Sequence, residues 1–373
     1  MRRNSCLDFT FSGTILGRLG PVRRGIRARR AGCGRIGTME PDTAFQPQSP
    51  RFRHEALVYE GTEDFVARAA GYVREGLDAQ EAVLVAVVTA NAQALRGELG
   101  QDAREVEFLD IKSLGPNPAR LIPAWQEWVD RNTAWPRAFR GIGEQIWAGR
   151  SPIEIRECQT HEHLLNAAFD AGPAWSLLCP YDARRLPAEV VEHVSGSHPI
   201  VLGGSDGDPS QRLAYDAKAA ERAFTAPLSD LRAPLAQLPF ALADLGRLRS
   251  LIRGLAPRLG LRGRRLADFL LVADELASNS IRHGGGKGRL LVWRDGAHAI
   301  CEVRDNGLIA DPLVGRRRPD VRTRDGGAGL WTANQISDLL LIHSTPSSGT
   351  TVRAYVDVGA ADDGWRVPDD FRP

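Results

Sequence analysis

The sequence predicts two domains of different fold class, an α/β domain over residues 51–200 and an α+β domain over residues 238–358. In the first, short apolar runs alternate with longer amphipathic segments, which is typical of a mostly parallel sheet with helices on both faces. In the second, two amphipathic segments precede strands joined by short turns, which favours helices gathered on one face of a sheet. Apolar residues at 43% and charged residues at 25% are ordinary for a soluble globular protein.

The elements of the first domain follow from hydrophobic spacing. Thr62 is expected to cap a helix reaching Glu75, and residues 82–88 form an apolar, β-branched run typical of a buried strand. Further elements are expected at residues 91–99 (helix), 106–111 (strand), 118–132 (helix), 137–142 (strand), 152–169 (helix) and 175–179 (strand). Residues 201–237 lose this alternation and carry turn residues, so we expect a linker with one short helix near residues 213–224.

Two amphipathic helices open the second domain, the first ending near Gly260 and the second carrying Leu266 through Ile281. The remaining elements are expected at residues 289–293 and 299–304 (strands), 308–325 (charged loop), 328–336 (helix), and 338–343 and 350–356 (strands). The acidic tail, residues 359–373, is expected to be frayed.

The formal charge of +2 conceals a basic leader. Residues 1–38 hold nine arginines and one acid, which leaves 39 basic and 45 acidic residues, or about −6, for the rest of the chain. That balance argues against direct nucleic-acid binding by the folded part. We expect residues 1–50 to be a disordered extension, with a transit peptide or a nucleic-acid or membrane arm as alternatives, and Met39 as an alternative start.

Two further features concern the compartment. No run of about 18 apolar residues occurs, so no membrane span is expected. Five scattered cysteines form no disulfide framework and fit a reducing cytoplasm.

The second helix of the second domain carries an acid, an amide and an imidazole on one line. Glu275, Asn279 and His283 are spaced by four residues, so their side chains share a face opposite the apolar one. An amide oxygen is a suitable ligand for Mg²⁺, and a carboxylate one turn away could deprotonate a hydroxyl. A solvated polar face is the alternative interpretation of this spacing.

Three glycine-containing or hydroxyl-bearing turns follow this helix. In Asp305-Asn306-Gly307 the carboxylate can accept a hydrogen bond from an exocyclic amine, and the glycine permits close backbone approach. Gly326, Gly327 and Gly329 open a helix at Leu330, where free N–H groups suit phosphates, although a flexible hinge has the same pattern. In the last turn, which includes Thr350, hydroxyl groups could reach a bound base.

In this order and spacing, the motifs resemble the ATP-binding domain of the GHKL superfamily (gyrase, Hsp90, histidine kinases, MutL) and, within it, the anti-sigma serine kinases. The resemblance covers about residues 238–358 and implies a two-layer, Bergerat-type sandwich that binds ATP and Mg²⁺. It implies that Asn279 holds Mg²⁺, that Glu275 is the catalytic base, and that Asp305 reads adenine. The glycines at 326, 327 and 329 would border the ATP lid and the phosphates. The chain departs from the family at Leu308-Ile309, where a second glycine is common.

The first domain contains histidines and cysteines but no convincing metal motif. Cys158 and His161 share a helical face, whereas His163 points elsewhere, so partly buried polar residues are the favoured interpretation. His54 could be a phosphoacceptor, but it lies in a short segment expected to precede the sheet, without a long helical hairpin.

Three stretches of the first domain resemble the MEDS sensory domain, which is similar to a RecA-like α/β fold and is proposed to sense small molecules. The stretches begin at Phe52, Arg140 and Cys179. No G-x-x-x-x-G-K-[ST] motif is present. Glu144, Trp147 and Arg150 follow a predicted strand end, where open α/β sheets place ligands, although Trp147 could serve packing alone.

The pairing of these two domains resembles an RsbA-like anti-sigma regulator. The leading hypothesis is a cytoplasmic serine/threonine kinase and anti-sigma factor that uses Mg-ATP to phosphorylate an anti-anti-sigma (STAS) partner. A sigma factor, a small-molecule ligand of the first domain and a homodimer are the other expected partners. A histidine kinase that uses His54 and a non-catalytic, nucleotide-binding signalling module are the alternatives.

Overall fold

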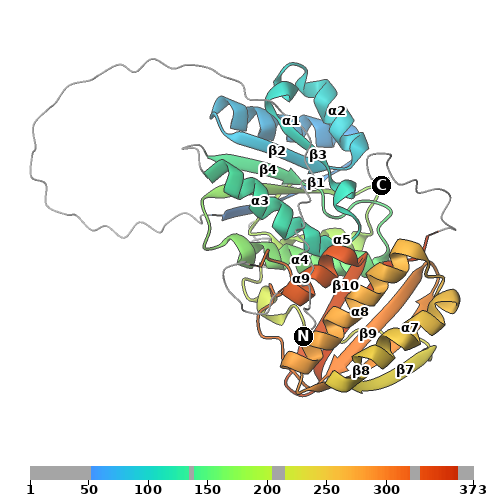
Figure 1. Cartoon of the computed structure of the whole chain (residues 1–373). Coiled ribbons are helices and arrows are strands. Elements are labelled where there is room, and N and C mark those ends of the chain that lie inside the picture. Colours follow the sequence, from blue (N-terminus) through green and yellow to red (C-terminus); the bar gives the residue numbers. More distant parts are fainter. Residues whose placement is uncertain (1–51, 134–137, 204–214, 320–327, 360–373) are drawn as a thin grey trace, which may run out of the picture. The chain divides into compact units, whose positions relative to one another are not determined.

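The computed structural model describes residues 52–133, 138–203, 215–319 and 328–359. These residues form two separate sheets, one parallel and one antiparallel (Figure 1). The α/β and α+β classes expected from the sequence are therefore confirmed.

The first sheet has six strands in the order β3-β2-β4-β5-β1-β6, and every neighbouring pair is parallel. The strands are β1 (Phe52–Tyr59), β2 (Ala82–Val87), β3 (Glu107–Asp110), β4 (Phe139–Gly143), β5 (Trp175–Asp182) and β6 (Ile200–Leu202). Because all six run the same way, their carboxyl ends meet at one edge of the sheet, which is where open α/β sheets place ligands.

Helices cover both faces of this sheet, as parallel strands require. Helices α1 (Thr62–Asp78) and α2 (Thr89–Leu99) pack on one face, and α3 (Leu121–Thr133) and α4 (Pro152–Phe169) pack on the other. Ser151 and Glu154 form a reciprocal capping box that fixes the start of α4. The shorter elements are η1 (Asp102–Glu105), η2 (Ile111–Leu114), η3 (Pro118–Arg120), α5 (Ala188–Glu192) and α6 (Val194–Ser197).

The second sheet has five antiparallel strands in the order β10-β11-β9-β8-β7. The strands are β7 (Ala236–Ala241), β8 (Lys287–Asp295), β9 (His298–Asp305), β10 (Leu339–Thr345) and β11 (Gly349–Asp357). Figure 1 shows α7 (Leu245–Leu259) and α8 (Gly263–His283) lying across one face of this sheet. Apolar residues of both helices form one core with alternate strand residues, including Leu290 and Val303. Helix α9 (Ala328–Ile336) contributes Leu330 and Ala333 to the same core.

The segment expected to be a linker is partly ordered against the second sheet. Leu228 and Leu231 pack on the opposite face of that sheet, beside Trp293 and Tyr355. The Trp293 indole N–H donates to the carbonyl oxygen of Arg232 at 2.6 Å. The expected short helix corresponds to η5 (Ala219–Arg222), and residues 204–214 lie outside the described residues.

Several sequence-based expectations are corrected. His54 does not precede the sheet but lies within β1, one of its inner strands. Strands β6 and β7 overlap the two ends of the expected linker, residues 201–237. Thr62 is the first residue of α1, and the cap position is Gly61, without a side-chain hydrogen bond. Within the described residues, no helix is long and apolar enough to cross a membrane.

Candidate functional site

Helix α8 brings Glu275 and Asn279 against the start of α9, as their spacing predicts. A β-carbon added to Gly329 would lie 2.9 Å from Glu275 Oε2 and 2.9 Å from Asn279 Oδ1. The glycine therefore lets the backbone of α9 approach both side chains, which a larger residue would push aside. Asn279 Nδ2 is buried and has no hydrogen-bond partner in the described part of the chain. Gly326 and Gly327 lie outside the described residues.

Asp305 closes the other end of this region, at the last residue of β9. Its Oδ1 accepts a hydrogen bond from the backbone N–H of Gly307 at 2.8 Å, and its Oδ2 accepts one from the Ser280 hydroxyl. Gly284, the residue after α8, packs directly against the Asp305 side chain, and an added β-carbon there would overlap it. The carboxylate is therefore held in one orientation from both the helix and the turn.

A relay of hydroxyl groups fixes the turn after Asp305. The Ile309 N–H donates to Ser344 Oγ at 2.9 Å, and Thr350 Oγ1 donates to the carbonyl oxygen of Gly307 at 2.9 Å. Ser344 Oγ and Thr350 Oγ1 are 2.7 Å apart. Because the Thr350 proton goes to Gly307, the Ser344 hydroxyl donates to Thr350. Thr350 thus supports the Asp305 turn from β11.

A cavity of about 400 Å³ lies between α8, this turn and the start of α9. Its polar lining side chains are Asn279, Ser280, His283, Asp305, Asp311 and Thr350. Its apolar lining side chains are Leu276, Val303, Leu308, Ile309, Ala310, Val314, Leu330 and Val352. Apolar walls with a few oriented polar groups are typical of a small-molecule site, and the volume is in the usual range. Glu275 is not in this lining; it lies one turn before Asn279, beside Gly329.

The structure therefore brings together most of the residues expected from the sequence, and it adds Ser280, Gly284 and Ser344. Gly284 begins a run of three glycines, a signal that indicates close packing after the helix. Ser280 and Ser344 had no such signal, because a single serine on a helix or strand is common. The residues fit a Mg-nucleotide: the Asn279 amide and the fixed Asp305 carboxylate line one cavity, and the backbone of Gly329 packs closely against Asn279.

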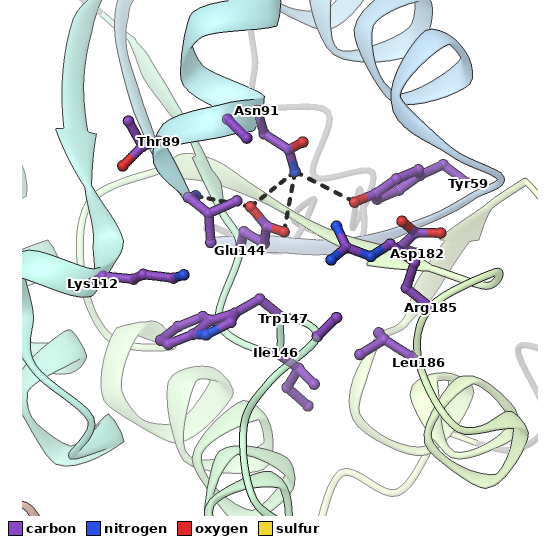
Figure 2. A pocket seen from close by; sticks show the side chains of 13 residues that line it. Tyr59, Thr89, Asn91, Lys112, Glu144, Ile146, Trp147, Asp182, Arg185 and Leu186 are labelled. Atoms are coloured by element: carbon purple, nitrogen blue, oxygen red, sulfur yellow. Dashed lines mark hydrogen bonds between the residues drawn. The ribbon is translucent and has the colours of Figure 1, made fainter.

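A second cavity, of about 300 Å³, lies at the carboxyl edge of the parallel sheet (Figure 2). Its lining residues are Tyr59, Val88, Thr89, Ala90, Asn91, Lys112, Glu144, Ile146, Trp147, Ala148, Asp182, Arg185 and Leu186. Glu144 lies at its centre, where its carboxylate accepts hydrogen bonds from the Val88 N–H at 2.9 Å and from Asn91 Nδ2 at 3.0 and 3.1 Å. Burial raises the pKa of Glu144 from 4.5 to about 7.

Of the three residues expected at this edge, Glu144 and Trp147 line the cavity and Arg150 does not. Arg150 is buried and donates to the carbonyl oxygens of Gln145 at 2.8 Å and Pro116 at 2.7 Å. Its guanidinium lies 3.7 Å from the centre of the Trp147 ring. Arg150 therefore packs against the Trp147 ring and does not line the cavity itself.

His54 is a poor phosphoacceptor, because its ring is 1% exposed in β1. Burial lowers the pKa of His54 to about 4, so the ring is neutral at neutral pH.

Cys158 and His161 are also fully buried, and Cys158 Sγ contacts the carbonyl oxygen of Gln145 rather than a histidine. Cys158 and His161, expected to be partly buried polar residues, are thus buried completely.

The fold and the site together define an α/β domain followed by an α+β domain whose cavity fits a nucleotide. Residues 53–199 match the family model described as MEDS, the methanogen/methylotroph, DcmR sensory domain. Residues 238–356 match the histidine kinase-like ATPase domain. No curated protein matches the chain. The chain thus pairs a domain similar to MEDS with one similar to the GHKL ATPases.

Proposed function

We propose that this chain is an ATP-dependent serine/threonine protein kinase that acts as an anti-sigma regulator. The observation that carries the proposal is the approach of Gly329 to Glu275 and Asn279, beside a cavity that ends at Asp305. This arrangement supports a site that holds the phosphates near Gly329 and the adenine ring at Asp305. The match of residues 238–356 to a histidine kinase-like ATPase domain supports ATP as the nucleotide.

Each residue then has one role. Bound Mg-ATP supplies the phosphoryl group and the charge neutralisation that phosphoryl transfer needs. The Asn279 amide oxygen is the protein ligand of Mg²⁺, because hard oxygen donors suit this ion. Asp305, fixed by Ser280 and Gly307, accepts a hydrogen bond from the exocyclic amine of adenine. Glu275 accepts the proton of the attacking serine or threonine hydroxyl.

The substrate and the regulation are the finer parts of the proposal. The phosphorylated partner is a STAS-type anti-anti-sigma protein. The protein is a homodimer, and it binds a sigma factor while it is not phosphorylating this partner. The cavity around Glu144 receives the small molecule that controls this switch. A match to a sensory family over residues 53–199 supports that role for the first domain.

A second candidate is a signalling module that binds nucleotide without transferring phosphate. The position of Glu275 outside the cavity lining favours it, since a base must reach the bound substrate. The histidine-kinase alternative is weakened by the burial of His54 in β1.

Phosphotransfer assays separate these functions. The protein is incubated with γ-labelled ATP and candidate STAS proteins, and the phosphoamino acid is then identified. We expect acid-stable phosphoserine or phosphothreonine on the partner, lost in Glu275→Gln although ATP still binds. Asp268→Asn is the matched control, because Asp268 lies two turns earlier on α8 and pairs with Arg264 at 3.8 Å.

Wild-type phosphorylation by Glu275→Gln would exclude Glu275 as the base. Acid-labile phosphate on the chain itself would instead indicate a histidine kinase. ATP binding without transfer to any STAS protein would favour the non-catalytic module.

A further inference from the structure

Four buried side chains with metal-binding atoms converge between the parallel sheet and α4. His54 comes from β1, Cys179 from the neighbouring β5, Glu162 from α4, and His198 from the residue after α6. One ligand atom of each lies within 4.8 Å of those of the other three, and all four residues are at most 1% exposed.

Three of the separations between these atoms are close to those of a single coordination sphere. His54 Nε2 is 3.1 Å from Glu162 Oε2 and 3.3 Å from Cys179 Sγ. His198 Nε2 is 3.5 Å from the same Glu162 oxygen. Tetrahedral ligands about 2.0 Å (nitrogen or oxygen) and 2.3 Å (sulfur) from a metal lie about 3.3–3.6 Å apart.

The other nitrogen of each imidazole is already hydrogen-bonded outward. His54 Nδ1 is 3.2 Å from Asn166 Oδ1, and His198 Nδ1 is 2.9 Å from the carbonyl oxygen of Val194. Asn166 Nδ2 donates to backbone carbonyl oxygens, including that of Ser197 at 2.9 Å, which leaves its Oδ1 as an acceptor for His54. These contacts allow each ring to carry its proton on Nδ1, the tautomer that metal-ligating histidines adopt when an outer partner orients them.

His54 Nε2 and His198 Nε2 both face the same oxygen of the Glu162 carboxylate. His198 Nε2 has no hydrogen-bond donor among the described residues. Ligand atoms gathered this closely around one carboxylate oxygen suit a shared cation.

A divalent metal would balance the negative charges of this cluster. With a carboxylate and a thiolate as ligands, the buried cluster becomes neutral overall. Two hydrogen-bond donors lie beside the anionic ligands. The Tyr181 hydroxyl donates to Glu162 Oε1 at 2.8 Å. Gln145 Nε2 lies 3.4 Å from Glu162 Oε2 and 3.7 Å from Cys179 Sγ. Such outer contacts are typical of metal sites.

We propose that His54, Glu162, Cys179 and His198 form a structural site for a divalent transition metal, with Zn²⁺ as the best match. Two nitrogens, one sulfur and one carboxylate oxygen suit Zn²⁺ and its substitute Co²⁺, and exclude Mg²⁺ and Ca²⁺, which prefer oxygen ligands. Four protein ligands close the coordination sphere, which is the pattern of a structural rather than a catalytic site. The metal joins β1 and β5 to α4 and the segment after α6.

Cobalt binding tests the site with a direct spectroscopic readout. The full chain is prepared without an affinity tag, with Cys6 and Cys33 changed to serine, and is titrated with Co²⁺ after removal of metals. We expect one ion per chain, with tetrahedral visible bands and a thiolate-to-cobalt charge-transfer band. Cys179→Ser should remove the charge-transfer band, and His198→Ala should weaken binding by more than about tenfold.

Cys158→Ser is the matched control, because Cys158 is equally buried on α4 but contacts only the Gln145 carbonyl oxygen. It should keep the band. If Cys179→Ser does not fold, X-ray absorption of the cobalt-loaded parent protein should show one sulfur among nitrogen and oxygen neighbours. Failure to bind a stoichiometric ion, a metal without a sulfur neighbour, or loss of the band in Cys158→Ser but not in Cys179→Ser would each overturn the proposal.

Discussion

Gly329 lies so close to Asn279 that one added methyl group would meet both atoms of the Asn279 amide, at 2.9 and 3.0 Å. The relationship joins the first turn of α9 to α8, two helices separated in sequence by strands β8 and β9 and the segment that follows them. It places backbone without side-chain bulk beside the only residue assigned to Mg²⁺. The nucleotide site therefore depends on a glycine as much as on its polar side chains.

Gly329→Ala should weaken nucleotide binding, because the new methyl group displaces Asn279 and Glu275. We expect the dissociation constant for ATP to rise by about tenfold or more, equivalent to about 1.4 kcal/mol. Titration calorimetry with Mg-ATP measures this. Gly254→Ala is the control: Gly254 lies on α7 with nothing within 4 Å of an added β-carbon, so ATP affinity should not change. Equal affinity in both variants would contradict the role of Gly329.

Asp305→Asn should reduce ATP affinity and selectivity together. The amide can still accept one hydrogen bond, but it loses charge, and its N–H₂ group cannot accept from Ser280, Gly307 or adenine. We expect a loss of about tenfold or more in ATP affinity and a smaller loss for GTP. Competition between a fluorescent ATP analogue and each nucleotide is the measurement. Asp295→Asn, at an exposed turn between β8 and β9, should leave both affinities unchanged.

Glu144 should make stability depend on pH. Its pKa is about 7 when folded and 4.5 when unfolded, so the folded chain holds more protons between these values. Its contribution is therefore fully present below about pH 4.5 and is lost as the pH rises through about 7. The loss is on the order of 3 kcal/mol, since a tenfold change in proton affinity is worth about 1.4 kcal/mol.

Urea unfolding of the wild type and Glu144→Gln at several pH values isolates this contribution from other titrating groups. The difference in unfolding free energy between the two proteins should move in favour of the variant as the pH rises. A difference that stays constant from pH 5 to pH 8 would show that Glu144 has an ordinary pKa.

Gly141→Ala should destabilise the first domain. A β-carbon at this position in β4 would lie 2.6 Å from the Trp125 ring, which is itself buried between α3 and the sheet. Overpacking of this kind costs about 1–3 kcal/mol. Gly97→Ala on the exposed side of α2 meets nothing within 4 Å and should instead be neutral or stabilising by up to about 1 kcal/mol. Urea unfolding of both variants is the test, and equal stability would contradict the packing described for Gly141.

The sequence was sufficient to predict the helices and strands whose hydrophobic residues recur with a clear period. Helices α4 and α9 begin and end at the expected residues, because a capping box and a glycine cluster mark their starts. The strands that it missed break the usual pattern. Pro239 in β7 indicates a loop, yet β7 is an edge strand, where a missing N–H group can face solvent.

The first strand was missed for a different reason. Strand β1 carries His54 and Glu55 inside the protein, so it lacks the continuous apolar run expected of a buried strand. His54 is also a member of the proposed metal cluster. Sequence spacing could not reveal that cluster, because its four ligands come from β1, β5, α4 and the residue after α6. Only the fold brings them together.

Titration of the full-length protein with ATP, in the presence and absence of Mg²⁺, tests the central claim most directly. The account predicts binding of one ATP per chain that requires Mg²⁺ and is abolished in Asn279→Ala, whose fold is checked by circular dichroism. Magnesium-independent binding of equal strength in the wild type and in Asn279→Ala, or no binding at all, would contradict it.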